Sequence, residues 1–159
     1  MLDDRKLRAW SGLGIGPAWQ PRQFEAASAS LEQPLSDTAA VPDWEGIASR
    51  VESCRDCPLG STRQNAVVGA GPSSAAWLLV GEAPGAEEDK TGEPFVGRAG
   101  ELLDAMMKAA GVDRQRDVYI TNVLKCRPPG NRNPEPLEVA QCDKHLLAQV
   151  QLLAPRLIL

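Results

Sequence analysis

Two apolar segments about forty residues apart limit the fold of this chain more than any other feature. Residues 75–80, AAWLLV, form an uninterrupted apolar run that ends in a turn containing Gly and Pro. Such a run is typical of a strand buried on both faces of a parallel sheet, and we expect the strand over Trp77–Val80. Residues 118–126, VYITNVLKC, are rich in β-branched and aromatic side chains and predict a second strand.

The segment between the two strands has the pattern of a helix. Residues 98–111 place four apolar side chains on one side of a predicted helix, namely Leu102, Leu103, Met106 and Ala110. Gly111 is a favourable residue for its C-terminal end. A strand–helix–strand order predicts an α/β fold, and we expect a three-layer α/β/α arrangement with a central parallel sheet.

The two ends of the chain differ from its middle. Residues 23–40 contain mostly Ala, Ser, Gln and Glu and few large apolar side chains, which is typical of a tether. We therefore expect residues 1–43 to be an N-terminal extension with a flexible tether, and residues 44–159 to be the folded domain. The last residues, PRLIL, predict the start of a third strand. A central strand at a chain end leaves a sheet edge exposed, so we expect the C-terminal part of this domain to be missing.

Charge and hydropathy limit where the protein can be located and which partners it can bind. The N-terminus lacks the apolar stretch of a signal peptide, and no apolar run approaches the roughly 20 residues of a membrane helix. We expect a cytoplasmic protein without membrane contact. Its net charge of -4 provides no overall basic field, so any contact with nucleic acid must be local.

Four cysteines are candidate metal ligands. Cys54 and Cys57 form a C-x-x-C pair, whereas Cys126 and Cys142 are separated by fifteen residues. Thiolates bind iron and zinc strongly, and four of them complete a tetrahedral set. The spacing leaves an iron–sulfur cluster and a zinc ion equally open, with a thioredoxin-like redox pair and scattered buried thiols as weaker alternatives.

The loop after the first predicted strand is acidic and rich in glycine. Four carboxylates lie in it: Glu82, Glu87, Glu88 and Asp89. Ligands of open α/β sheets bind at the carboxyl ends of strands, and glycines leave backbone N–H groups free to hold an anion. A solvated acidic turn at a helix start is the plainer alternative. The loop is no phosphate-binding P-loop, because G-x4-G-K-[ST] does not occur.

The second predicted strand carries polar residues of interest. Asn122 lies inside the strand, where a carboxamide needs partners and matches the edge of a nucleic-acid base. A basic stretch without acids follows it and contains Lys125, Arg127 and Arg132. These three side chains are the best phosphate contacts that the acidic chain offers, although solvated loop residues are an equal alternative.

Four segments together resemble the family 4 uracil-DNA glycosylases, which contain an iron–sulfur cluster. They are C-x2-C-P-L at 54–59, GEAPGAEEDKTGEPFVGRAG at 81–100, VYITNVLKCRPPGNRNP at 118–134 and the predicted helix with Cys142. The resemblance runs from Cys54 to the C-terminus and implies a 4Fe-4S cluster on the four cysteines. It also implies a monomeric enzyme that hydrolyses the N-glycosidic bond of uracil in uracil-containing DNA.

The resemblance implies a role for each site residue. Phe95 stacks on a flipped uracil, while Asn122 accepts from its N3–H and donates to its O4. The backbone of Glu82 and Ala83 lies against a carbonyl of the base, and Glu82 or Glu88 positions water or stabilises the sugar cation.

The chain also departs from the family pattern. A later family motif with a uracil-binding His does not occur, and the sole histidine, His145, lies in the middle of a predicted helix. Ala83 stands where other glycosylase families place an Asp. A cluster-bearing nucleic-acid-binding module, or a truncated and inactive glycosylase, is therefore the alternative.

Overall fold

A short parallel sheet forms the centre of the protein. The computed structural model describes residues 43–159, so the predicted extension and tether over residues 1–42 lie outside the described part. Strand β1 (Trp77–Gly81) lies between β2 (Val118–Asn122) and β3 (Leu157–Ile158), in the order β2-β1-β3. Both neighbours are parallel to β1. The two predicted strands and the third one at the chain end are thus confirmed.

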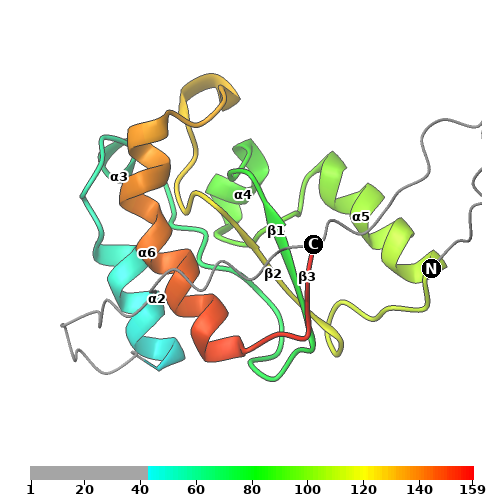
Figure 1. Cartoon of the computed structure of the whole chain (residues 1–159). Coiled ribbons are helices and arrows are strands. Elements are labelled where there is room, and N and C mark those ends of the chain that lie inside the picture. Colours follow the sequence, from blue (N-terminus) through cyan, green and yellow to red (C-terminus); the bar gives the residue numbers. More distant parts are fainter. Residues whose placement is uncertain (1–42) are drawn as a thin grey trace, which may run out of the picture. The chain divides into compact units, whose positions relative to one another are not determined.

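Helices cover the sheet on both faces, as Figure 1 shows for α2 and α6 on one side and α5 on the other. Their bounds are α2 (Trp44–Ser53), α3 (Leu59–Thr62), α4 (Ala86–Thr91), α5 (Arg98–Ala109), the 3-10 helix η1 (Pro129–Asn131) and α6 (Pro136–Leu153). The three-layer α/β/α arrangement with a central parallel sheet is confirmed. None of the helices between residues 43 and 159 has the length and apolar character that a membrane crossing requires.

One face of the sheet packs against α6 and α2. Leu78 and Tyr119 are paired in register on β1 and β2 and form a buried cluster with Leu153 of α6. The ring of Trp44, the first residue of α2, lies 4.8 Å from the Tyr119 ring between centroids. This contact fixes the start of α2 on the sheet. The side chain of Asp43 caps the same helix by accepting from the N–H of Gly46 at 2.8 Å.

The opposite face packs against α5, and of the predicted apolar side chains Leu103 contributes to this packing. Met107 is buried with Val118 and Ile120, and Leu103 packs against them. Leu102 and Met106 instead remain 63% and 60% exposed. Two neighbouring apolar stripes share the helical repeat on α5, and periodicity alone does not distinguish them. Only the contacts of the sheet decide which stripe is buried.

Helix α6 starts later than its sequence indicates. Asn133 with Pro134 predicts the N-cap, yet the helix begins at Pro136 with Glu135 as N-cap. The Glu138 carboxylate accepts from the Glu135 N–H at 2.9 Å, which closes a capping box. A carboxylate three residues into the helix therefore satisfies the N–H of the N-cap residue.

Candidate functional site

The carboxyl ends of β1 and β2 bring the predicted base-binding residues together. Gly81 and Asn122 are register partners at these ends, and Asn122 is 2% exposed. A Cβ atom at Gly81 would lie 2.3 Å from Asn122 Oδ1 and 2.5 Å from Phe95 Cζ. The amide and the ring thus meet over a residue that has no side chain. Within the described part of the chain, the Asn122 amide makes no hydrogen bond of its own and is available to a ligand.

Phe95 is held in an unusual backbone conformation. Its φ of 54° lies in the left-handed region, which residues with side chains rarely adopt. Glu88 Oε1 accepts from the N–H groups of Val96 and Gly97 at 3.0 and 2.9 Å. A Cβ atom at Gly100 would lie 1.9 Å from the Phe95 carbonyl oxygen, so α5 can approach this loop only with glycine there.

Arg114 holds the same loop from another side. Its Nη1 donates to the Phe95 carbonyl at 3.0 Å and to Asp104 Oδ1 at 2.8 Å, and its Nη2 donates to the Pro94 carbonyl. The sequence did not single out Arg114, because it lies nineteen residues after Phe95 in an ordinary polar turn. Glu88 and Arg114 together fix the direction of the Phe95 ring.

The contacts of Glu88 correct its predicted role as a carboxylate that positions water. The side chain is 9% exposed and accepts from backbone N–H groups. Burial acts to raise the pKa of Glu88, but the N–H groups of Gly97, Val96 and Gly85 outweigh it and lower the pKa below its usual 4.5. Glu88 is therefore a charged anchor of the Phe95 loop. Glu82 is exposed at the end of β1, and Ala83 is half-buried beside it.

Lys125 is also corrected, because it cannot contact a DNA phosphate from its position. The side chain is 1% exposed, and burial lowers its pKa to about 7. Its Nζ donates to Thr121 Oγ1, the Asn122 carbonyl and Gln149 Oε1, each at 2.7 Å. All three donors of the ammonium group are thus used inside the protein. Lys125 ties the end of β2 to α6.

The other two basic residues lie at the surface. Arg127 Nε donates to Asn131 Oδ1 at 2.7 Å and so braces the loop at η1. Arg132 pairs with the buried Glu138 at 2.6 Å while its own side chain stays 38% exposed. The hydrogen bond to Glu138 raises the pKa of Arg132. A DNA contact by Arg127 or Arg132 stays a prediction.

All four cysteines line one cavity between α2 and α6. Cys54 caps the end of α2, Cys57 follows it, Cys126 lies beyond β2 and Cys142 is on α6. The cavity has a volume of about 10 Å³, so its lining side chains lie close together. Among residues 43–159, no three Cys, His, Asp or Glu side chains converge directly on one ion position.

Burial disfavours thiolates in this cavity, and a guanidinium opposes that effect at one sulfur. Burial raises the pKa of Cys126 and brings that of Cys142 to about 11. Arg63 opposes this at Cys126, because its Nη1 donates to the sulfur at 2.9 Å. The Nη2 of Arg63 donates to the Val51 carbonyl at 2.9 Å, which fixes it at the end of α2. The sequence did not indicate Arg63, which lies 63 residues from its sulfur partner.

Comparison with known proteins gives one consistent result. The family model "Uracil DNA glycosylase superfamily" matches residues 68–159. The chain is similar to the type-4 uracil-DNA glycosylases of Thermotoga maritima, 52% identical over 72% of this chain and 59% of the relative, and Archaeoglobus fulgidus, 50% identical over 72% and 57%. It is also 30% identical to the type-5 uracil-DNA glycosylase of Thermus thermophilus, over 70% of this chain and 64% of the relative.

The superfamily match covers the strand ends, the Phe95 loop, Cys126 and Cys142. The chain spans about three-fifths of the length of the type-4 relatives. The superfamily match and the high identity to type-4 members lead to one assignment. The chain belongs to the uracil DNA glycosylase superfamily, in its type-4 branch.

Proposed function

We propose that this chain forms the base-reading and cofactor-holding part of an enzyme that releases uracil from DNA. The observation that carries the proposal is the meeting of Asn122 and Phe95 over Gly81 at the ends of β1 and β2. An aromatic ring and an amide without an internal partner are the groups needed to stack a flipped base and to read its edge. The relatives described above are named uracil-DNA glycosylases, which supports uracil as that base.

Asn122 distinguishes uracil from cytosine by the direction of its hydrogen bonds. Uracil offers an N3–H donor and an O4 acceptor, which match the carbonyl and the NH2 group of one amide. Cytosine offers an acceptor at N3 and a donor at N4. In the same amide orientation the carbonyl would face the N3 acceptor and the NH2 group would face the N4 donor, so neither hydrogen bond forms. The strand position of Asn122 and its contact with Gly81 restrict the amide to few orientations.

The reaction that we propose is hydrolysis with the base as leaving group. The bond between the sugar C1′ and uracil N1 breaks, the oxygen of water adds to C1′, and uracil takes up a proton after it leaves as an anion. Donors that stabilise this anion lower the barrier. The N–H of Ala83 has no acceptor among residues 43–159, and it lies at the end of β1 beside the base-reading residues. Glu82, exposed next to it, is the carboxylate for water or the sugar cation.

The cofactor that we propose is a 4Fe-4S cluster held by Cys54, Cys57, Cys126 and Cys142. All four cysteines line one cavity, so one group can bind all four sulfurs, and the resemblance to the cluster-containing family favours a cluster over a single zinc ion. The cluster supplies no step of the hydrolysis. Its iron ions would offset the free-energy cost of ionising the buried thiols of Cys126 and Cys142. The bonds to the four sulfurs would also join α2, α6 and the segment after β2.

The partner that we propose is uracil-containing DNA, bound by a cytoplasmic monomer. Arg127 and Arg132 are the phosphate contacts, because both reach the surface after β2. Unstacking a base from duplex costs a few kcal/mol, and the cost is smaller at a mismatch or in a single strand.

The test is uracil release from a single-stranded oligonucleotide by the full-length protein. We expect free uracil and an abasic site with the unmodified protein, and a loss of about 100-fold or more in Asn122→Ala. The visible absorbance of the cluster serves as the control for folding. Salt-dependent DNA binding without any abasic product would contradict the proposal and favour a binding module without catalysis.

A further inference from the structure

The histidine that the family pattern leaves without a role is buried in an unusual way. His145 lies on α6 and is 6% exposed, and its Nε2 is the one buried side-chain nitrogen or oxygen without a hydrogen-bond partner among residues 43–159. An unpartnered polar atom in a protein interior costs about 1–3 kcal/mol. Such an atom is rare in native structures and calls for a partner that the protein atoms do not include.

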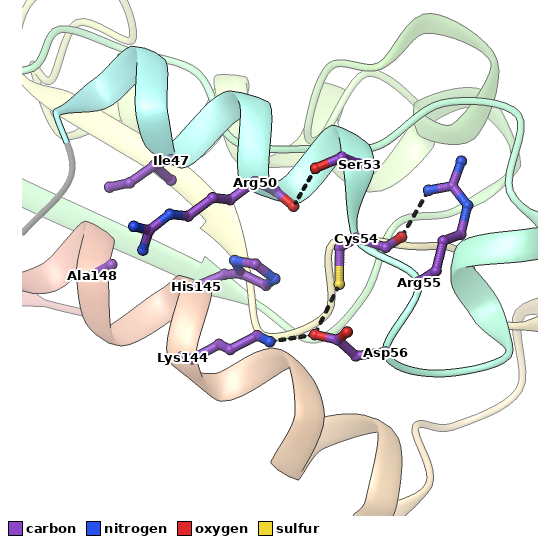
Figure 2. A pocket seen from close by; sticks show the side chains of 9 residues that line it. All are labelled: Ile47, Arg50, Ser53, Cys54, Arg55, Asp56, Lys144, His145 and Ala148. Carbon is purple, nitrogen blue, oxygen red and sulfur yellow. Dashed lines mark hydrogen bonds and ion pairs between the residues drawn. The ribbon is translucent and has the colours of Figure 1, made fainter. Parts of the chain in front are cut away.

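Two hollows meet at this imidazole. Figure 2 shows the first, a surface pocket in which the His145 ring lies between the Arg50 side chain of α2 and the sulfur of Cys54. The second is the cavity lined by the four cysteines, and His145 lines that as well. His145 lines both hollows, and solvent does not reach its Nε2. A group bound in the cysteine cavity would supply the partner that the protein atoms do not include.

We propose that the Nε2–H of His145 donates a hydrogen bond to a sulfur atom of the cluster and thereby raises its reduction potential. This inference rests on the cofactor of the proposed function. The sulfurs of a bound cluster carry negative charge and are the acceptors that this cavity would contain. The donor is present in the neutral imidazole with its hydrogen on Nε2 and also in the charged form, so the bond does not depend on titration.

Arg63 is a second hydrogen-bond donor that lines the same cavity. Its Nη1 already donates to Cys126 Sγ at 2.9 Å. Arg63 follows α3 and is bonded to the end of α2, whereas His145 comes from α6. The two donors thus reach the cluster from separate elements. Hydrogen bonds to the sulfurs stabilise the more negative, reduced state and set the potential within a cluster type.

The experiment measures the reduction potential of the cluster in the full-length protein by spectroscopically monitored titration. His145→Leu removes the donor and keeps an apolar filler, and we expect the ratio of reduced to oxidised cluster at a fixed potential to fall about fivefold, the weight of one hydrogen bond. His145→Gln keeps an N–H near the same place and should keep most of the reduction potential of the unmodified protein. Arg50 lines the surface pocket but not the cysteine cavity, so Arg50→Lys, which keeps the charge, should leave the potential unchanged.

Each result has a defined meaning. A coloured His145→Leu protein with an unchanged potential would overturn the inference and leave the cofactor in place. An equal shift in His145→Gln and His145→Leu would also overturn it, because the N–H would then not be the cause. A colourless unmodified protein without iron would overturn both this inference and the proposed cofactor.

Discussion

The Nη1 of Arg114 lies 3.0 Å from the carbonyl oxygen of Phe95 and so holds the backbone of the proposed stacking residue. The same guanidinium reaches Asp104 on α5, so the loop, the turn before β2 and the helix form one unit. Phe95 therefore depends on a residue that has no contact with the base-reading edge. The direction of the Phe95 ring therefore depends on α5 and on the turn before β2 as well as on its own loop.

Arg114→Ala should weaken uracil excision without removing any group of the site. We expect a loss of about 2 kcal/mol in the free energy of unfolding, because buried carbonyls lose charged donors. KM for a single-stranded substrate should rise about tenfold through misplacement of the Phe95 ring. Arg116→Ala is the matched control, since Arg116 is 71% exposed and its side chain pairs with its neighbour Asp117. Equal behaviour of the two variants would contradict the anchoring role.

Gly81→Ala should separate the amide from the ring. The added methyl group would meet Asn122 Oδ1 at 2.3 Å and Phe95 Cζ at 2.5 Å, so one of the two must move. We expect uracil release to fall about 100-fold, because small displacements at a reacting centre are costly. Unchanged cluster absorbance and circular dichroism would show that the fold survives. Full activity in this variant would rule out the proposed position of the base.

Glu88→Gln should change the acid stability of the protein. The pKa of Glu88 is lowered in the folded state, so its contribution is fully present above its usual value of 4.5 and is lost as pH falls through the folded pKa. Glutamine cannot titrate, and we expect Tm of the variant to be lower at neutral pH but less dependent on pH below 4.5. Thermal unfolding between pH 3 and pH 7 measures this. Parallel Tm curves for the two proteins would refute it.

Lys125 and Arg127 should respond differently in DNA binding, although they are two residues apart. Arg127→Gln should reduce the slope of log K against log salt by about 0.7 on single strands, the value for one lost phosphate contact. Lys125→Met should leave this slope unchanged, because Lys125 is 1% exposed and bonded internally. Its effect should appear instead as a lower Tm. A reduced slope in Lys125→Met would mean that the side chain leaves the interior when DNA binds.

The sequence predicted the strands well because their signal is local. The apolar run at 77–80 and the β-branched run at 118–122 need no distant partner to be recognised. The side of α5 that packs on the sheet could not be predicted in this way. Leu102 and Leu103 fit the helical repeat equally, and only the positions of Val118 and Ile120 favour the second.

The sequence indicated which residues form the site better than it indicated what each residue does. The motifs placed Asn122 and Phe95 near one edge, but charge in a sequence says nothing about burial, so Lys125 was wrongly assigned to DNA. Arg63 and Arg114 escaped notice because each acts through a contact far along the chain, and His145 was given no role because its feature is a missing partner. Such contacts follow from the packing of helices on the sheet and have no local pattern.

The left-handed backbone at Phe95 has a consequence for the energetics of recognition. A residue with a side chain in this conformation costs about 1–3 kcal/mol, and here Glu88 and Arg114 offset that cost during folding. The ring is therefore preorganised before any base arrives. An extruded base loses its own freedom on entry, but it does not have to order the surface on which it stacks.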